Sequence, residues 1–145
     1  VYFAAKLYQM ATAGYSVTPL LKKLGIKPET KLLLINQPDD YYSLLDVNVK
    51  DHLMKKNETP DLVHLFAKNY KEFDNEMKKL KPVCKKNSAI TIWVSWHKRS
   101  AKIPTDLTED VIRNYALKNN LVDVKVCAVS DIWSGLKLVV PLNKR

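Results

Sequence analysis

Short, continuously apolar runs recur along the chain and are separated by polar stretches. Residues 32–35, 62–67 and 89–95 form three such runs. Apolar runs of about four to eight residues between turn residues are typical of strands buried on both faces of a sheet. We therefore predict three central strands there. Residues 45–50 alternate between apolar and polar positions, which favours a further, half-exposed strand.

Helical spacing occurs in the segments between these runs. Leucines between a capping Thr18 and Gly25 predict a short helix, and residues 41–45 predict another. A longer helix is expected after the second run, because four apolar side chains recur every three or four positions: Tyr70, Phe73, Met77 and Leu80. We expect this helix to end before Pro82, whose ring disfavours a helix interior.

The last part of the chain combines one more helix with a hairpin. Asp106 and Glu109 have the spacing of a capping box for a helix that extends to about Lys118. Residues 121–129 and 136–140 then form two strand-like runs joined by a short turn, as in an antiparallel hairpin. Strands alternating with helices predict a three-layer α/β domain, with a mostly parallel sheet and an antiparallel closing hairpin.

Length and composition fit one globular domain. The chain has 145 residues, of which 46% are hydrophobic and 27% charged, and roughly 150 residues per domain is the usual scale. Met10 looks like a natural start, so we interpret residues 1–10 as an extension and residues 11–145 as the domain. No signal peptide and no membrane-spanning run is recognised, and Cys84 and Cys127 are widely spaced, so we expect a cytoplasmic protein with free thiols.

A net charge of +9 favours anionic partners. Lysine supplies most of the positive charge, whereas arginine is the usual residue for bidentate contacts with phosphates and bases. Nucleic-acid binding is therefore an alternative rather than the leading hypothesis. Lysines also cluster in residues 78–86, at the end of the predicted long helix, where cations complement the helix dipole.

Six segments carry a resemblance to a known family: ATAGYSVTPLLKKLGIKP, LLLINQPDDYYSLL, DLVHLFA, WVSWHKRS, TDLTEDVIRNYAL and LVDVKVCAVSDIWSGLKLV. They resemble a family of small bacterial proteins classified as a domain of unknown function. The order of elements also resembles a shortened S-adenosylmethionine-dependent methyltransferase. These resemblances imply a Rossmann-like, methyltransferase-like fold with strand order 2-1-3-4-6-5. The family itself implies no activity.

The turn after the first strand departs from the methyltransferase pattern because it contains no glycine. A cofactor-binding turn needs positive backbone angles and little side-chain bulk, but residues 36–41 read NQPDDY. Asp51 is only a weak match to the acidic residue that would bind the ribose. A divergent methyltransferase or other group transferase is therefore the alternative, and a non-enzymatic domain without a cofactor is the leading hypothesis.

Polar and charged side chains follow the predicted central strands. Ligands of open α/β sheets bind beyond the carboxyl ends of the strands. Six residues are expected there: Asn36, Lys68, Ser95, Trp96, Lys98 and Arg99. They offer hydrogen bonds, positive charge and a stacking surface. We therefore hypothesise a site for a small anionic ligand or a protein partner at this edge, while a solvated connection is the competing interpretation.

No sequence pattern indicates catalysis or a metal site. His64 lies inside an apolar run and is expected to be a hydrogen-bonded core residue. Protonation of His97 is expected to be disfavoured by Lys98 and Arg99. The histidines and cysteines lack metal-ligand spacing, and no nucleophile motif occurs. We name no catalytic residue, no metal and no cofactor, and we keep a homo-oligomer as an alternative.

Overall fold

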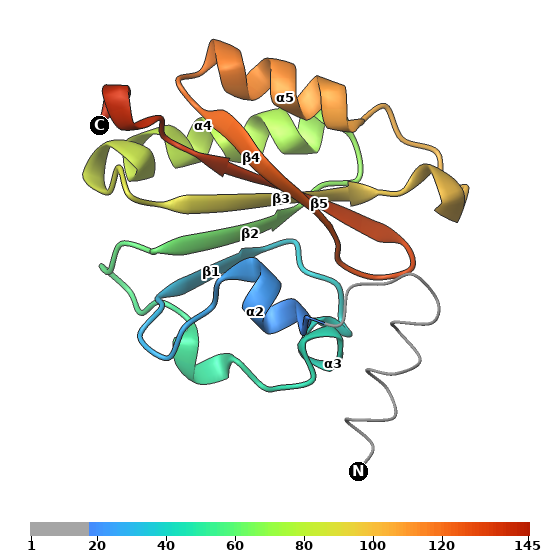
Figure 1. Ribbon diagram of the computed structural model, residues 1–145, viewed down its shortest axis with the longest axis horizontal. Helices are drawn as coiled ribbons and strands as arrows, with labels where there is room; N and C mark the ends of the chain where they lie inside the picture. The colour runs from blue at the N-terminus through green and yellow to red at the C-terminus, as the bar shows by residue number, and fades with distance from the viewer. Residues whose placement is uncertain (1–17) are drawn as a thin grey trace.

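Five strands form one mixed sheet in the computed structural model, which describes residues 18–145 (Figure 1). The sheet order is β1-β2-β3-β5-β4. The strand bounds are β1 Leu32–Ile35, β2 Leu62–Phe66, β3 Thr91–His97, β4 Val122–Ala128 and β5 Trp133–Val139. Parallel pairing joins β1 to β2 and β2 to β3, whereas β5 is antiparallel to both β3 and β4. The predicted α/β sheet with an antiparallel closing hairpin is confirmed.

The strand predicted for residues 45–50 is wrong. Leu45 instead ends the short helix α3 (Tyr41–Leu45), and a 3-10 turn η1 follows at Lys50–His52. Leu45 and Val49 are both buried, whereas Val47 is 43% exposed, so the apolar side chains do not share one face of a strand. Without this strand, the expected order 2-1-3-4-6-5 reduces to the observed one, and the other five strands have the predicted neighbours.

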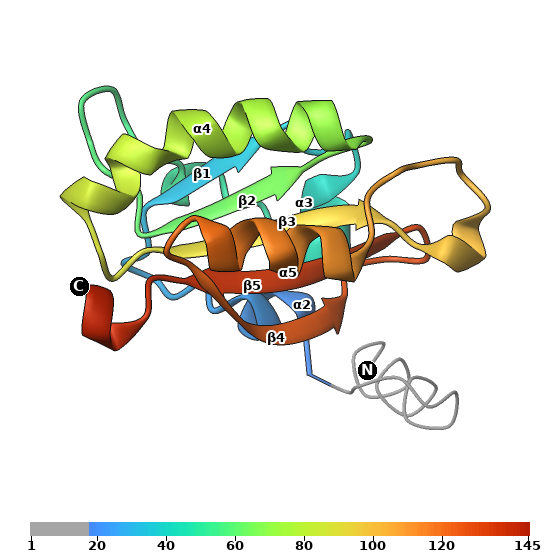
Figure 2. The same cartoon turned by 90° about the horizontal axis from the view of Figure 1, so that it is seen from above.

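Two helical layers cover the sheet. Helices α2 (Leu20–Leu24) and α3 pack on one face, and α4 (Tyr70–Lys86) and α5 (Glu109–Lys118) pack on the other. Figure 2 shows α4 and α2 on opposite sides of the sheet. Alternate residues of β2 enter the two cores, with Leu65 facing α4 and Phe66 facing α2. This alternation explains why the whole run is apolar.

Helix α4 continues through Pro82 to Lys86, so the prediction that it ends before Pro82 is wrong. The helix begins at Tyr70 and is capped by Asn69, whose side chain accepts a hydrogen bond from the backbone N–H of Glu72 at 2.9 Å. A proline inside a helix costs about 3 kcal/mol. Leu80 and Val83, on either side of Pro82, pack into the core beneath α4, and their burial offsets that cost.

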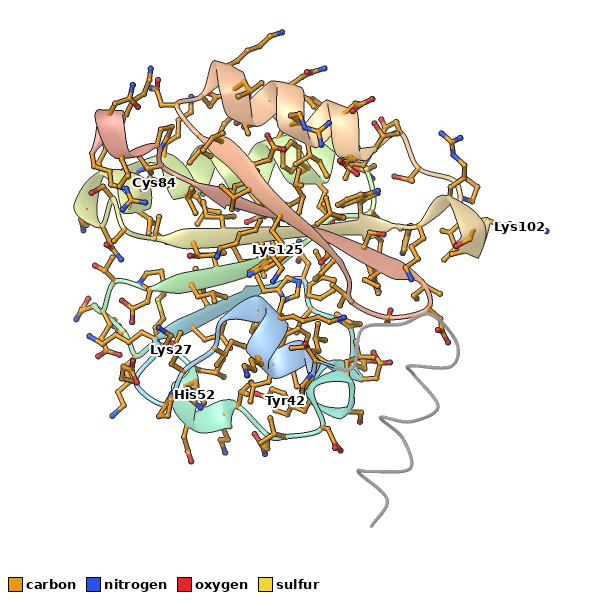
Figure 3. All side chains as sticks on the ribbon, in the orientation of Figure 1. Lys27, Tyr42, His52, Cys84, Lys102 and Lys125 are labelled. Carbon is orange, nitrogen blue, oxygen red and sulfur yellow. The ribbon has the colours of Figure 1, made fainter. Side chains whose placement is uncertain are left out.

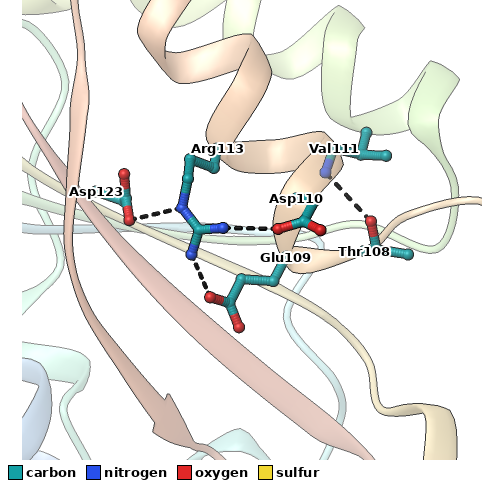
Figure 4. Close-up of polar contacts among 6 residues, drawn as sticks. All are labelled: Thr108, Glu109, Asp110, Val111, Arg113 and Asp123. Atoms are coloured by element: carbon teal, nitrogen blue, oxygen red, sulfur yellow. Dashed lines mark hydrogen bonds and ion pairs between the residues drawn. The ribbon is translucent and has the colours of Figure 1, made fainter.

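Helix α5 is capped by a different residue from the one predicted. The Thr108 side chain accepts a hydrogen bond from Val111 N–H at 3.2 Å (Figure 4). Asp106 instead accepts a hydrogen bond from the backbone N–H of Tyr70, at 2.7 Å. The predicted Asp106–Glu109 capping box is therefore wrong, and Asp106 ties the loop before α5 to the first turn of α4.

Candidate ligand site at the carboxyl edge of the sheet

The chain leaves two neighbouring parallel strands in opposite directions. From β1 it leads to α3 on one face of the sheet, and from β2 it leads to α4 on the other. In open α/β sheets, such a divergence opens a crevice beyond the carboxyl ends of the strands, where ligands bind. Asn36 directly follows β1, and Lys68 lies two positions after the end of β2. Both predicted residues therefore lie at this divergence.

Asn36 makes the bend after β1 that the methyltransferase pattern assigns to glycine. Its φ is 58°, in the left-handed region. Asparagine tolerates this conformation better than most residues. The turn thus has the positive backbone angle without a glycine, but it keeps the bulk of an exposed asparagine side chain.

A buried chain of hydrogen bonds crosses from α3 to β3. Tyr41 Oη lies 2.8 Å from His64 Nδ1, and His64 Nε2 lies 2.7 Å from Ser95 Oγ. His64 and Ser95 are fully buried, and Tyr41 is 2% exposed. Burial lowers the pKa of His64 to about 3, so its ring is neutral and can donate one of these bonds and accept the other. The prediction of a hydrogen-bonded core histidine is confirmed, and Ser95 faces this core.

The remaining predicted residues lie in different surroundings. Trp96 is 7% exposed and packs in the core beneath α4 and α5, on the face opposite to Ser95. The backbone N–H of Lys98 donates to the carbonyl of Ile132 in the β4–β5 turn. Arg99 is exposed and opens the 3-10 turn η2 (Arg99–Ala101). The sheet thus brings Lys68 and Lys98 to one edge, while Ser95 and Trp96 face the two cores.

The structure adds two residues that were not among the six expected to form the ligand site. His97 ends β3, Trp133 begins β5, and the sheet register pairs them. Their ring centroids lie 4.1 Å apart, and Phe66 packs edge-on against Trp133 at 5.0 Å. His97 is 8% exposed and Trp133 is 5% exposed. The three rings form an aromatic cluster at the carboxyl edge.

Two buried nitrogen atoms of this cluster have no hydrogen-bond partner among residues 18–145. They are His97 Nδ1 and Trp133 Nε1. Trp93 Nε1, by contrast, donates to the carbonyl of Leu24 at 2.9 Å. A buried polar atom without a partner costs about 1–3 kcal/mol, so such atoms often mark a site that another group completes.

Lys68 places positive charge beside the aromatic cluster. The pKa of His97 is lowered mainly by burial and also by the nearby Lys68 ammonium group, so the ring is neutral near pH 7. The sequence had assigned this repulsion to Lys98 and Arg99. Two acidic residues of this edge are held by backbone donors: Glu72 accepts from Lys68 N–H and Asp106 from Tyr70 N–H. Lys68 has no ion pair within the described part of the chain.

The two cysteine thiols are not activated as nucleophiles. Cys84 and Cys127 are free thiols, and burial raises the pKa of each. Within residues 18–145, no group of three or more His, Cys, Asp or Glu side chains is placed to hold a metal ion. None of the helices of that range is long and apolar enough to cross a membrane.

The backbone is similar to a crystal structure of a protein from Streptococcus agalactiae described as a member of the NADB-Rossmann superfamily. The TM-score is 0.51, and the match covers 86% of this chain and 69% of that chain. The fold is Rossmann-like. At 12% sequence identity, the likeness shows the fold alone. No protein-family model and no curated protein sequence matches the chain, so the resemblance to one bacterial family and to methyltransferases stays a prediction.

Proposed function

We propose that this Rossmann-like domain binds a small anionic ligand at the carboxyl edge of its sheet, with Trp133, His97 and Lys68 as the contacts. The observation that carries the proposal is the buried Trp133 N–H, which finds no partner among residues 18–145. An indole nitrogen can only donate a hydrogen bond, so the missing group must be an acceptor. Lys68, which is close enough to lower the pKa of His97, favours an acceptor with negative charge.

The donor set favours a carboxylate or a phosphate. Neutral His97 can donate from Nδ1 when its other ring nitrogen is unprotonated, so it can share the oxygen atoms of such a group with Trp133. Lys98, directly after His97, adds a second ammonium group at the same edge. Hydrogen bonds between charged and neutral partners are stronger than those between neutral groups, and they are strengthened where water is excluded.

Binding without catalysis fits the side chains around this site. Ser95 and His64, which are hydrogen-bonded as in a nucleophile–base pair, are both fully buried. The low pKa of His64 makes it a weak base, because only a small driving force favours proton transfer to it. These features support a binding role for the carboxyl edge rather than a hydrolytic one.

The indole N–H signals provide a direct test. Uniformly ¹⁵N-labelled protein is titrated with inorganic phosphate and, separately, with acetate. We expect the Trp133 Nε1–H signal to shift saturably, while the Trp93 signal stays in place because Leu24 already accepts its bond. Lys68→Gln should weaken the affinity about tenfold, and the matched control Lys27→Gln, at the far end of the sheet (Figure 3), should not change it.

Two results would overturn the proposal. One is a Trp133 signal that no anion moves, and the other is equal affinity for Lys68→Gln and Lys27→Gln. S-adenosylmethionine forms a third arm of the same titration, because it tests the group-transferase alternative. Tight binding of this cofactor with a shift of the Asn36 amide, and no response to simple anions, would favour that alternative instead.

A further inference from the structure

A cleft lies at the opposite end of the sheet from the proposed anion site. It has a volume of about 730 Å³ and lies between the C-terminal ends of α4 and α5. Small-molecule sites usually measure roughly 300–1,000 Å³, so this volume is sufficient for one ligand molecule. Figure 3 shows Cys84, which lines the cleft, far from Lys102, which lies in the loop after β3.

The cleft has an apolar floor and a cationic rim. Its floor comes from both helices and the adjoining strand ends and includes Leu80, Cys84, Leu121 and Val140. Three lysines stand around it: Lys81 and Lys85 on α4 and Lys118 on α5. All three are exposed, and long lysine stems can cover apolar surface while the ammonium group stays in water.

The acidic residues of α4 and α5 form their ion pairs with residues outside the cleft. None of the residues that line the cleft is acidic. On α4, Lys78 pairs with Asp74 and Lys79 pairs with Glu76, whereas no ion pair of residues 18–145 includes a rim lysine.

On the side of α5, acidic residues gather on Arg113, away from the cleft. Its guanidinium group binds Glu109, Asp110 and Asp123 of β4 (Figure 4). The distance is 2.7 Å to Asp110 and 2.9 Å to Asp123. Hydrogen bonds to Asp123 and Glu109 raise the pKa of Arg113. The acidic residues of α5 thus lie at its N-terminal end, around Arg113, while its C-terminal end carries Lys118, which lines the cleft.

The negative C-terminal ends of the helix dipoles offset only part of the positive charge of the three lysines. The C-terminal ends of α4 and α5 each contribute about half an elementary charge of negative character. Together they offset about one of the three lysines. The three lysines alone therefore leave an excess of about two positive charges over the apolar floor. Lys144 and Arg145 also line the cleft and add to this excess, because their hydrogen-bond acceptors, Asn120 and the carbonyl of Val140, are neutral.

We infer that this cleft binds a single-chain amphiphilic anion. Its carboxylate or phosphate head would lie among Lys81, Lys85 and Lys118, and its apolar chain would lie over Leu80 and Cys84. A neutral apolar ligand would give the lysines no anionic partner, and a small anion would leave the apolar floor exposed to water. The concave shape and limited volume fit one molecule rather than a flat lipid surface.

The test uses dodecanoate below its micelle concentration, with dodecanol and acetate as controls for the charge and the chain. Affinity is measured by calorimetry. The rate at which iodoacetamide alkylates Cys84 gives a second, local readout. Cys127, in the core on the other face of the sheet, is the internal control. We expect dodecanoate to bind at least tenfold more tightly than either control and to slow alkylation of Cys84 but not of Cys127.

Two double variants on the same helix separate site binding from general charge. Lys81→Gln with Lys85→Gln should weaken dodecanoate binding about tenfold and remove the protection of Cys84. Lys78→Gln with Lys79→Gln removes the same charge from lysines already paired with acids, and it should leave both readouts unchanged. Equal affinity for the two double variants would overturn the inference. Binding of dodecanol or of acetate with the same affinity as dodecanoate would also overturn it.

Discussion

Lowering the pH from 7 to 4.5 is expected to destabilise the protein through His64. This ring is fully buried, and burial lowers its pKa to about 3 from an ordinary value near 6.5. In the unfolded chain the ring takes up a proton below about pH 6.5, whereas in the folded protein it does so only near pH 3. The free energy of unfolding that depends on a neutral His64 ring is therefore fully present above about pH 6.5 and decreases as the pH falls below that value.

The size of the effect follows from the two pKa values. Between pH 6.5 and 3, each pH unit removes about 1.4 kcal/mol of stability. From pH 7 to pH 4.5, the loss from His64 alone is therefore about 2.5 kcal/mol, a large fraction of the stability of a domain of this size. Urea unfolding at both pH values measures it, with His64→Gln as the comparison because glutamine keeps hydrogen-bonding capacity without titrating.

The difference between the two proteins isolates His64, because every other group titrates in both. Wild-type protein should lose about 2.5 kcal/mol more than His64→Gln between pH 7 and 4.5. In addition, the ¹⁵N signals of the His64 ring should keep the neutral pattern in folded protein at pH 4.5. An equal loss of stability in both proteins, or a protonated ring at pH 4.5, would refute the reasoning.

Three further changes of stability follow from single contacts, each measured by urea unfolding at pH 7. Tyr41→Phe removes the hydroxyl that bonds to His64 Nδ1 and should cost about 1–3 kcal/mol, since it leaves a buried ring nitrogen unpartnered; a loss below about 0.5 kcal/mol would contradict the buried chain. Gly135→Ala should cost about 1–3 kcal/mol, because the new Cβ would lie 3.1 Å from Val129 and 3.3 Å from Trp93; unchanged stability would show that these side chains yield freely. Asn69→Ala should cost about 1 kcal/mol through loss of the cap of α4, and Asn69→Asp should restore most of it.

The strands were predictable where burial on both faces makes the sequence continuously apolar, as in residues 62–66. The strand prediction for residues 45–50 was wrong because a helical spacing and a strand-like spacing of apolar residues overlap there. Leu45 and Val49 are buried with a spacing of four, but Val47 between them imitates the alternation of a strand. The prediction that the long helix ends before Pro82 was wrong for another reason. Tertiary packing of Leu80 and Val83 outweighs the local preference against proline in a helix.

The candidate site was predictable only to the level of the sheet edge. Topology placed Asn36 and Lys68 beyond the carboxyl ends of the strands, because that position depends only on where each strand ends. The pairing of His97 with Trp133 depends on the register of β5 against β3, and no local pattern encodes it. The lysines near the end of α4 were evident in the sequence, but the cleft also needs the C-terminal end of α5 beside them.

A high-resolution crystal structure of the protein grown with inorganic phosphate would show directly whether the carboxyl edge binds an anion. We expect density for phosphate within hydrogen-bond distance of Trp133 Nε1, with the Lys68 ammonium group on the same oxygen atoms. A structure in which a protein carbonyl accepts the hydrogen bond of Trp133 Nε1, and no anion lies beside Lys68, would contradict this expectation.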